Sequence, residues 1–318
     1  MRHHSDEDHA VRVTIVHNPD SGEGNVSGSD LRSMVAANGY DATYVSTTDP
    51  RSVTEALAAP SDLVVAAGGD GTVRQVAHHL LGRDLPFTIL PMGTANNLGT
   101  TLGLVGAPAS LIAGWATGRR ERLDVVLVSG CCGPRFAIEG VGIGPVASTI
   151  AALSQLTDRE ARADRVQDEL RRDMKVLREI VADCPAHPCQ VTLDHRDLSG
   201  TYLAVEAMNI RSVGPNVELA PDADPFDGQF DVVLVANDQR ANLRDYLTAK
   251  LEGIDSPPWL PSHRGRELHI RWNGSRVHID DEIWPDERHA AHGLCWPSQV
   301  DLDLRLSADP LTVLVPRR

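Results

Sequence analysis

The stretch LVVAAGGDGTVRQV, residues 63–76, combines groups that bind phosphate with a group that binds a metal ion. Glycines at the end of a strand allow positive φ and let backbone N–H groups approach a ligand, and the following helix N-terminus favours negative charge. Asp70 alone would repel phosphate, but its carboxylate suits the Mg²⁺ that accompanies a nucleoside triphosphate. The stretch therefore predicts a site where phosphate and Mg²⁺ meet, in preference to a tight turn that needs glycine for geometry alone.

Two more polar loops follow predicted strands: NPDSGEG, residues 18–24, and PMGTANNLG, residues 91–99. Ligands of an open parallel sheet bind beyond the carboxyl ends of its strands, so three such loops at one edge predict a nucleotide site. The candidate nucleotide-binding residues are Asn18, Ser21, Gly68, Gly69, Gly71, Thr72, Gly93, Thr94, Asn96 and Asn97.

Strand-like and helix-like segments alternate over residues 11–122, which predicts βαβ units and a parallel sheet. Farther along, short strand-like runs joined by turns predict an antiparallel β domain. The N-terminus is polar and lacks the apolar core of a signal peptide. We expect a disordered tail (1–10), a nucleotide-binding α/β domain (11–123), an antiparallel β domain (124–300) and a closing segment (301–318).

One long helix is expected within the β domain, at about residues 150–182, because apolar residues recur there with helical spacing. Its other face carries mixed charge. We expect it to lie on its own domain or on a second copy of the chain in a homodimer. A membrane-surface helix would carry a basic polar face, so transient contact with a membrane surface is the weaker alternative.

Composition excludes several functions for the 318-residue chain. A formal net charge of −14 argues against nucleic-acid binding, which needs a basic footprint, and against broad attachment to anionic membranes, although a local basic patch would still dock. No apolar run reaches the roughly 20 residues that span a bilayer. Five cysteines, an odd number, suggest reduced thiols and a cytoplasmic protein, and CPAHPC (184–189) is read as a turn rather than a metal site.

At this point the motifs resemble those of the diacylglycerol kinase catalytic-domain family, which includes bacterial soluble lipid kinases and the sphingosine and ceramide kinases. The three loops resemble its N-P-x-S-G, GGDGT and P-x-G-T-x-N-D motifs. PDADPFDGQFDVVLV (221–235) and HIDDE (278–282) resemble its Asp-Gly-x-Phe-Asp stretch and its Asp-Gly-Glu, and LTVLVP (311–316) its closing strand. The resemblance covers nearly the whole chain; GGDGT alone also occurs in NAD kinases.

The resemblance implies an α/β nucleotide domain with a parallel sheet, an antiparallel β-sandwich acceptor domain (124–300) and a cleft between them. It also implies that the closing segment (301–318) returns to the first domain, and that ATP and Mg²⁺ are the cofactors. It implies that Glu282 is the general base, that Asp70 holds Mg²⁺ or its waters, and that Asp124 joins this acidic network. It also implies a structural Mg²⁺ held by Asp227 with the carbonyls of Asp224 and Gln229. Without the resemblance, Asp124 and Asp227 would be read as ordinary turn or strand-start residues.

Three departures from the family pattern bear on activity. Asn97 stands where the family has Asp, so one carboxylate of the network is lost. Asp281 replaces the glycine of Asp-Gly-Glu; if that position needs positive φ, Asp tolerates it, and its charge is expected to raise the pKa of Glu282. The long charged helix stands where related enzymes carry Gly- and aromatic-containing segments, which makes a lipid acceptor less certain than the kinase reaction.

The leading hypothesis is an ATP-dependent kinase that phosphorylates a lipid hydroxyl, with diacylglycerol first and a sphingoid base second. A NAD kinase-like enzyme, or another small-molecule kinase, shares GGDGT, but the Asp-Gly stretch and HIDDE count against it. A degenerate kinase that binds nucleotide without turnover would explain Asn97 and Asp281. Localisation is expected in the cytoplasm or peripherally at the membrane.

Overall fold

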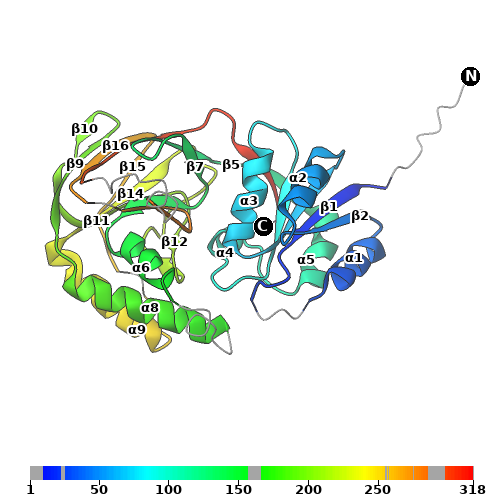
Figure 1. The fold of residues 1–318 in the computed structure, drawn as a ribbon, viewed down its shortest axis with the longest axis horizontal. Helices are drawn as coiled ribbons and strands as arrows, with labels where there is room; N and C mark the ends of the chain where they lie inside the picture. The colour runs from blue at the N-terminus through cyan, green and yellow to red at the C-terminus, as the bar shows by residue number, and fades with distance from the viewer. Residues whose placement is uncertain are drawn as a thin grey trace, which may run out of the picture. The chain divides into compact units, whose positions relative to one another are not determined.

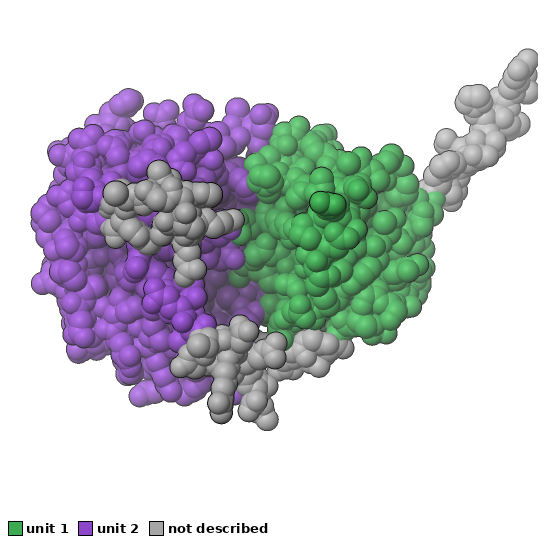
Figure 2. Space-filling view, in the orientation of Figure 1, with its two compact units in different colours: residues 1–93, 102–121, 311–318 green, residues 94–101, 122–310 purple. Residues whose placement is uncertain are grey.

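The computed structural model describes residues 10–22, 26–156, 166–254, 256, 258–274, 276–285 and 298–317. Residues 1–9 of the expected tail, and Cys295, lie outside them. The chain divides into two compact units (Figure 2). Unit 1 consists of Met1–Gly93, Leu102–Glu121 and Leu311–Arg318, and unit 2 of Thr94–Thr101 and Arg122–Pro310.

Unit 1 is built on a six-stranded sheet with the strand order β2-β1-β3-β4-β20-β5 (Figure 1). The strands are β1 (Arg12–His17), β2 (Asp41–Ser46), β3 (Leu63–Gly68), β4 (Phe87–Pro91), β5 (Arg119–Leu123) and β20 (Leu311–Val315). β1 pairs in parallel with β2 and β3, and β4 pairs in parallel with β3 and β20. All six residues of β3 are buried, as its continuous apolar run predicted.

Helices cover this sheet. They are α1 (Gly28–Ala37), α2 (Pro50–Ala58), α3 (Asp70–Leu80) and α5 (Pro108–Gly114), followed by the 3₁₀ turn η1 (Trp115–Thr117). Ser27 and Asp30 form a capping box at the start of α1, and Asp49 caps α2. Leu31 of α1 and Ile112 of α5 pack in one core with Ile15 of β1, so α1 and α5 share a face of the sheet.

Unit 2 is built on a large sheet whose described strands pair antiparallel, as predicted for this part of the chain. Its main path runs β18-β17-β8-β11-β9-β16-β19-β6-β7, and β14 pairs with both β11 and β15. The strands are β6 (Val126–Gly130), β7 (Arg135–Ala137), β8 (Gly140–Ile143), β9 (His187–Leu193), β10 (Arg196–Asp197), β11 (Gly200–Met208), β14 (Phe230–Ala236), β15 (Ser262–Gly265), β16 (Glu267–Trp272), β17 (Val277–Ile279), β18 (Glu282–Trp284) and β19 (Val300–Leu306), with the separate hairpin of β12 (Ser212–Val213) and β13 (Val217–Glu218).

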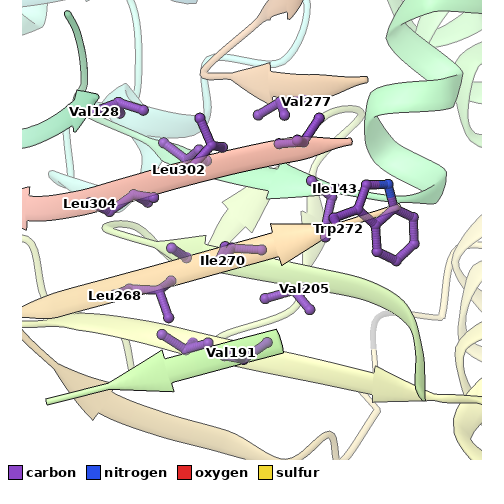
Figure 3. Close-up of a cluster of buried hydrophobic side chains, with 14 of the residues drawn as sticks. Val128, Ile143, Val191, Val205, Leu268, Ile270, Trp272, Val277, Leu302 and Leu304 are labelled. Atoms are coloured by element: carbon purple, nitrogen blue, oxygen red, sulfur yellow. The ribbon is translucent and has the colours of Figure 1, made fainter. Parts of the chain in front are cut away.

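Two apolar cores flank the strands of unit 2. Val205 of β11 lies in the first core with Val277, Leu302 and other strand residues (Figure 3). Leu203 and Ala204 of the same strand lie in the second core, which the helices α6, α8 and α9 line. The sheet is therefore covered by strands on one side and by helices on the other.

The single long helix expected at 150–182 was wrong. The structure has α6 (Pro145–Leu153), α8 (Val166–Asp183) and, later in the chain, α9 (Arg240–Leu251) after the 3₁₀ turn η2 (Asn237–Gln239). α6 ends in turns at residues 154–156, and 157–165 lie outside the described residues. Met174, Leu177 and Val181 of α8 are buried in the helix-lined core, so α8 lies on its own unit, as the apolar stripe predicted.

The units differ in detail from the expected domains. Thr94–Thr101, which contains the short helix α4 (Asn97–Thr101), belongs to unit 2 although it was assigned to the nucleotide domain. Of the expected closing segment 301–318, residues 301–306 belong to β19 of unit 2, and β20 lies in the sheet of unit 1. The reason is the pairing of β19 with β16 and β6, which the sequence pattern does not reveal.

Candidate functional site

The loops that follow β1, β3 and β4 converge in unit 1. The backbone N–H of Asn18 donates to the carbonyl of Ala67, and that of Met92 donates to the carbonyl of Gly68, both at 2.9 Å. The residue Gly22 approaches Met92 so closely that a Cβ there would collide with the Met92 carbonyl oxygen. The structure therefore brings the predicted N-P-x-S-G and GGDGT loops and the start of the third loop together at one sheet edge.

Gly68 and Gly69 of GGDGT serve close packing rather than positive φ, which corrects one of the sequence-based reasons given for these glycines. Gly68, Gly69 and Gly71 are absent from the described glycines with positive φ. A Cβ on Gly68 would overlap the buried Thr72 hydroxyl, and a Cβ on Gly69 would come within 3.1 Å of the Gly93 Cα. Thr72 therefore packs against the loop itself, and its role toward a nucleotide stays a prediction.

The N-terminus of α3 can receive an anion. Gly69 is the N-cap and supplies no side chain to cap the helix. The amides of Thr72 and Val73 turn back to the Gly69 carbonyl, while the helix dipole places partial positive charge at this end. Asp70 is the one acidic residue of the first turn and is half-buried. Backbone donors beside one carboxylate fit phosphate that arrives with a cation.

Thr94 and Asn97 form side-chain hydrogen bonds within unit 2. Thr94 Oγ1 donates to Glu169 Oε2 on α8 at 2.8 Å. Asn97, 3% exposed, donates from Nδ2 to the Gly214 carbonyl at 3.0 Å. An ionised carboxylate has no proton to donate, so the amide at this position makes a bond that the Asp of the family pattern cannot make.

Asp124, Asp224 and Asp227 approach one another at the start of β14. The Gly228 amide donates to Asp124 Oδ2 at 2.7 Å, and the Gln229 amide donates to Asp227 Oδ1 at 2.9 Å. Burial raises the pKa of Asp124 to about 6; the Gly228 bond opposes this shift, and the charges of Asp227 and Asp224 add to it. The neighbouring carboxylates therefore favour the protonated form of Asp124.

The HIDDE motif forms the turn between β17 and β18, with Ile279 opposite Glu282. Positive φ occurs at Asp280 (53°), the first turn residue, and not at Asp281, so the replacement of glycine by Asp281 meets no such requirement. The buried Asp280 carboxylate accepts the amides of Ile138, Glu139 and Gly140. Burial raises the pKa of Asp280 to about 6 while these amides oppose the shift.

Asn209, which sequence reasoning missed, joins the backbone at Asp124 to the strand segment that holds the Asp280 turn. Asn209 Nδ2 donates to the carbonyls of Asp124 (3.0 Å) and Ile138 (2.8 Å), and the Ile138 amide donates to Asp280. Asn209 follows β11 directly, and its pairing across 85 residues has no local sequence signal. The predicted residues therefore fall into two groups, one in each unit.

The donor set fits Mg²⁺. In the described part of the chain no three His, Cys, Asp or Glu side chains form a metal site. Mg²⁺, however, is usually bound by one or two carboxylates, with the remaining positions filled by phosphate and water. Asp70 alone, or Asp227 with backbone carbonyls, meets that requirement in ligand type. The metal roles of Asp70, Asp227, Asp224 and Gln229 stay predictions.

A pocket of about 450 Å³ lies within unit 2, between α4, α8, the β12–β13 hairpin and the end of α9. Its lining mixes apolar and polar side chains: Leu170, Met174 and Leu251 with Asn97, Glu218 and Lys250. Glu282 is not part of this lining. The mixed lining of this pocket suits an amphiphilic molecule.

Comparison with known proteins gives two family matches. Residues 12–128 match the diacylglycerol kinase catalytic domain, and residues 146–291 match the YegS C-terminal NAD kinase beta sandwich-like domain. None of the described helices is long and apolar enough to span a membrane.

Curated relatives resemble most of the chain. A protein named "Diacylglycerol kinase" from Mycobacterium tuberculosis is 25% identical over 86% of this chain and 89% of its own length. A "Probable lipid kinase YegS-like" from Pseudomonas aeruginosa is 29% identical over 70% of this chain and 73% of its own length. A crystal structure of a diacylglycerol kinase from Bacillus anthracis superposes with a TM-score of 0.68 at 19% identity, covering 96% of both chains, and so shares the fold.

Proposed function

Because the chain belongs to the diacylglycerol kinase catalytic-domain family, we propose that it is a lipid kinase that transfers the γ-phosphoryl group of ATP to a lipid hydroxyl. Diacylglycerol is the first candidate acceptor, and a sphingoid base is the second. The observation that carries the proposal is the convergence of the phosphate-type loops after β1, β3 and β4 in a chain that matches both family domains.

The loops of unit 1 would hold the triphosphate. The uncapped N-terminus of α3 directs amides and partial positive charge toward the phosphates, and the close approach of Gly69 to Gly93 leaves the loops free of side chains there. Asp70 would hold Mg²⁺ through its carboxylate. When bound, Mg²⁺ neutralises charge that develops on the transferred phosphoryl group.

Glu282 would take the proton of the acceptor hydroxyl as its oxygen attacks the γ-phosphorus and the bond to the ADP oxygen breaks. The residue begins β18, directly after a turn that three backbone amides hold through Asp280. A rigid strand end is a suitable support for a base, because in-line transfer depends on position.

The pocket beside α8 supports an amphiphilic acceptor. Leu170 and Met174 offer apolar surface, while Lys250 and Glu218 offer polar groups at the same wall. A NAD kinase-like activity remains the second candidate, since the C-terminal family match carries the NAD kinase beta sandwich-like description.

The test is to incubate the protein with Mg²⁺ and γ-labelled ATP, with a total lipid extract in one tube and NAD in another. Label in the organic phase supports the proposal, and the labelled product identifies the acceptor. Label on NAD alone would replace it with the second candidate. ATP binding without any transfer would indicate a degenerate kinase.

A further inference from the structure

A glycine between two strands lets two buried polar side chains meet. β17, β8 and β11 are neighbours in the sheet, and both His278 of β17 and Glu206 of β11 lie opposite Gly142 of β8. Two strand spacings, about 9.6 Å, separate the outer strands. A Cβ on Gly142 would overlap the Glu206 carboxylate and approach His278 Nε2 to 2.6 Å. The absent side chain leaves the space in which His278 Nε2 and Glu206 Oε2 lie 2.6 Å apart.

His278 connects this pair to the turn that precedes Glu282. Its Nδ1 lies 3.0 Å from the Asp280 carbonyl oxygen, so Nδ1–H donates to that oxygen while Nε2 faces Glu206. Both side chains are completely buried. Burial lowers the pKa of His278, but the facing carboxylate and the hydrogen bonds raise it by more, so the net shift is upward.

Buried charge pairs contribute little net stability relative to apolar side chains of similar size, because both groups lose their hydration. They do fix geometry, since each partner has few alternatives. Here both ring nitrogens of His278 are engaged, and the ring cannot turn without leaving a buried group unpaired. The Asp280 turn is thus held twice, by its own carboxylate and by the His278 ring.

We propose that Glu206 is a positioning residue that acts through His278, across Gly142, to hold the Asp280–Asp281 turn and the Glu282 carboxylate in place. The catalytic part of this inference rests on the proposed function, because it assumes that Glu282 is the base. The structural part concerns the hairpin alone and is measurable in a protein without activity.

The first experiment compares Glu206→Leu with Val205→Ala, a core variant on the same strand. In Glu206→Leu, amides 280–283 should exchange with solvent about tenfold faster, beyond the change at the other amides of the sheet. The kcat for lipid phosphorylation should fall about tenfold or more at unchanged KM for ATP. Val205→Ala should lower the melting temperature without either effect. Equal hairpin exchange and equal kcat in the two variants would overturn the proposal.

Two further variants separate positioning from stability. Glu206→Gln keeps a hydrogen-bonding partner for His278 and should preserve much of the hairpin protection. The double variant Glu206→Leu/His278→Leu removes both buried polar groups, so its melting temperature should recover while hairpin protection and kcat stay low. Recovery of both in the double variant would show that the pair is only structural. If the unaltered protein transfers no phosphate, the proposed function fails, and the exchange data alone decide on the hairpin.

Discussion

Thr94 Oγ1 donates a hydrogen bond of 2.8 Å to Glu169 Oε2, which joins a residue predicted to bind phosphate to the first turns of α8. The Thr94 hydroxyl hydrogen is therefore already used in the bond to the Glu169 carboxylate. A second negative charge arriving at Thr94 would meet the charge of Glu169. If Thr94 binds phosphate as predicted, we expect α8, for which the family resemblance gave no role, to influence nucleotide affinity through this contact.

Glu169→Gln should therefore tighten ATP binding. Glutamine keeps an oxygen that accepts from Thr94, but the charge is gone, so Kd should fall roughly two- to tenfold at low ionic strength. Titration calorimetry measures this. Glu179→Gln, an exposed change on the same helix, is the matched control and should leave Kd unchanged. Equal affinity in both variants would contradict an electrostatic role for Glu169.

Asp70→Ala should abolish phosphoryl transfer and leave the fold intact. The carboxylate is the acidic group of the α3 N-terminus, and alanine favours helix there. Circular dichroism and the melting temperature report the fold, and label transfer from ATP reports activity. A variant with a rate close to that of the unaltered protein would refute the proposed Mg²⁺ role of Asp70.

Asn97→Asp should lower stability. The buried amide donates to the Gly214 carbonyl, and a carboxylate there would set oxygen against oxygen, at a cost of about 1–3 kcal/mol. The melting temperature measures this, with Asn38→Asp as control, because Asn38 donates a similar bond to the Met34 carbonyl at an exposed position. Equal losses would contradict the importance of burial. The same preparation tests whether the restored carboxylate raises the rate, as the family pattern predicts.

Asp124 should make the folded state less stable as pH rises. Its pKa is about 6 in the folded chain against 3.8 in the ordinary state, so between these values the folded chain holds its proton more tightly. The contribution favours folding at the acid end and is lost as pH rises through about 6.

The free energy of unfolding of Asp124→Asn, relative to the unaltered protein, should therefore increase from about pH 4 to about pH 7. Denaturant titrations in the presence of EDTA measure it without metal binding. A difference that stays constant over this pH range would contradict the raised pKa of Asp124.

Sequence patterns predicted those features of the fold that depend on neighbouring residues, such as buried strands and the loops that follow them. The apolar run of β3 is fully buried, and the loops after β1 and β3 meet the start of the loop after β4, because parallel strands share one carboxyl edge. The prediction of one long helix was wrong because residues 154–156, where α6 ends in turns, contain no Gly or Pro that would mark an interruption. The contact between Glu206 and His278 depends on the register of their strands on either side of Gly142. The hydrogen bond between Thr94 and Glu169 joins residues 75 positions apart in the sequence. No single-sequence pattern carries such pairings.

The most direct test of the account is transfer of label from γ-labelled ATP to purified diacylglycerol in mixed micelles, with the product identified by mass spectrometry. The unaltered protein should form the phosphomonoester of the acceptor, and Glu282→Gln should bind ATP equally well but lose about 100-fold or more of the rate. Turnover by Glu282→Gln at the unaltered rate would remove Glu282 as base. Absence of the phosphomonoester, with diacylglycerol and with a sphingoid base, would contradict the central claim that this chain is a lipid kinase.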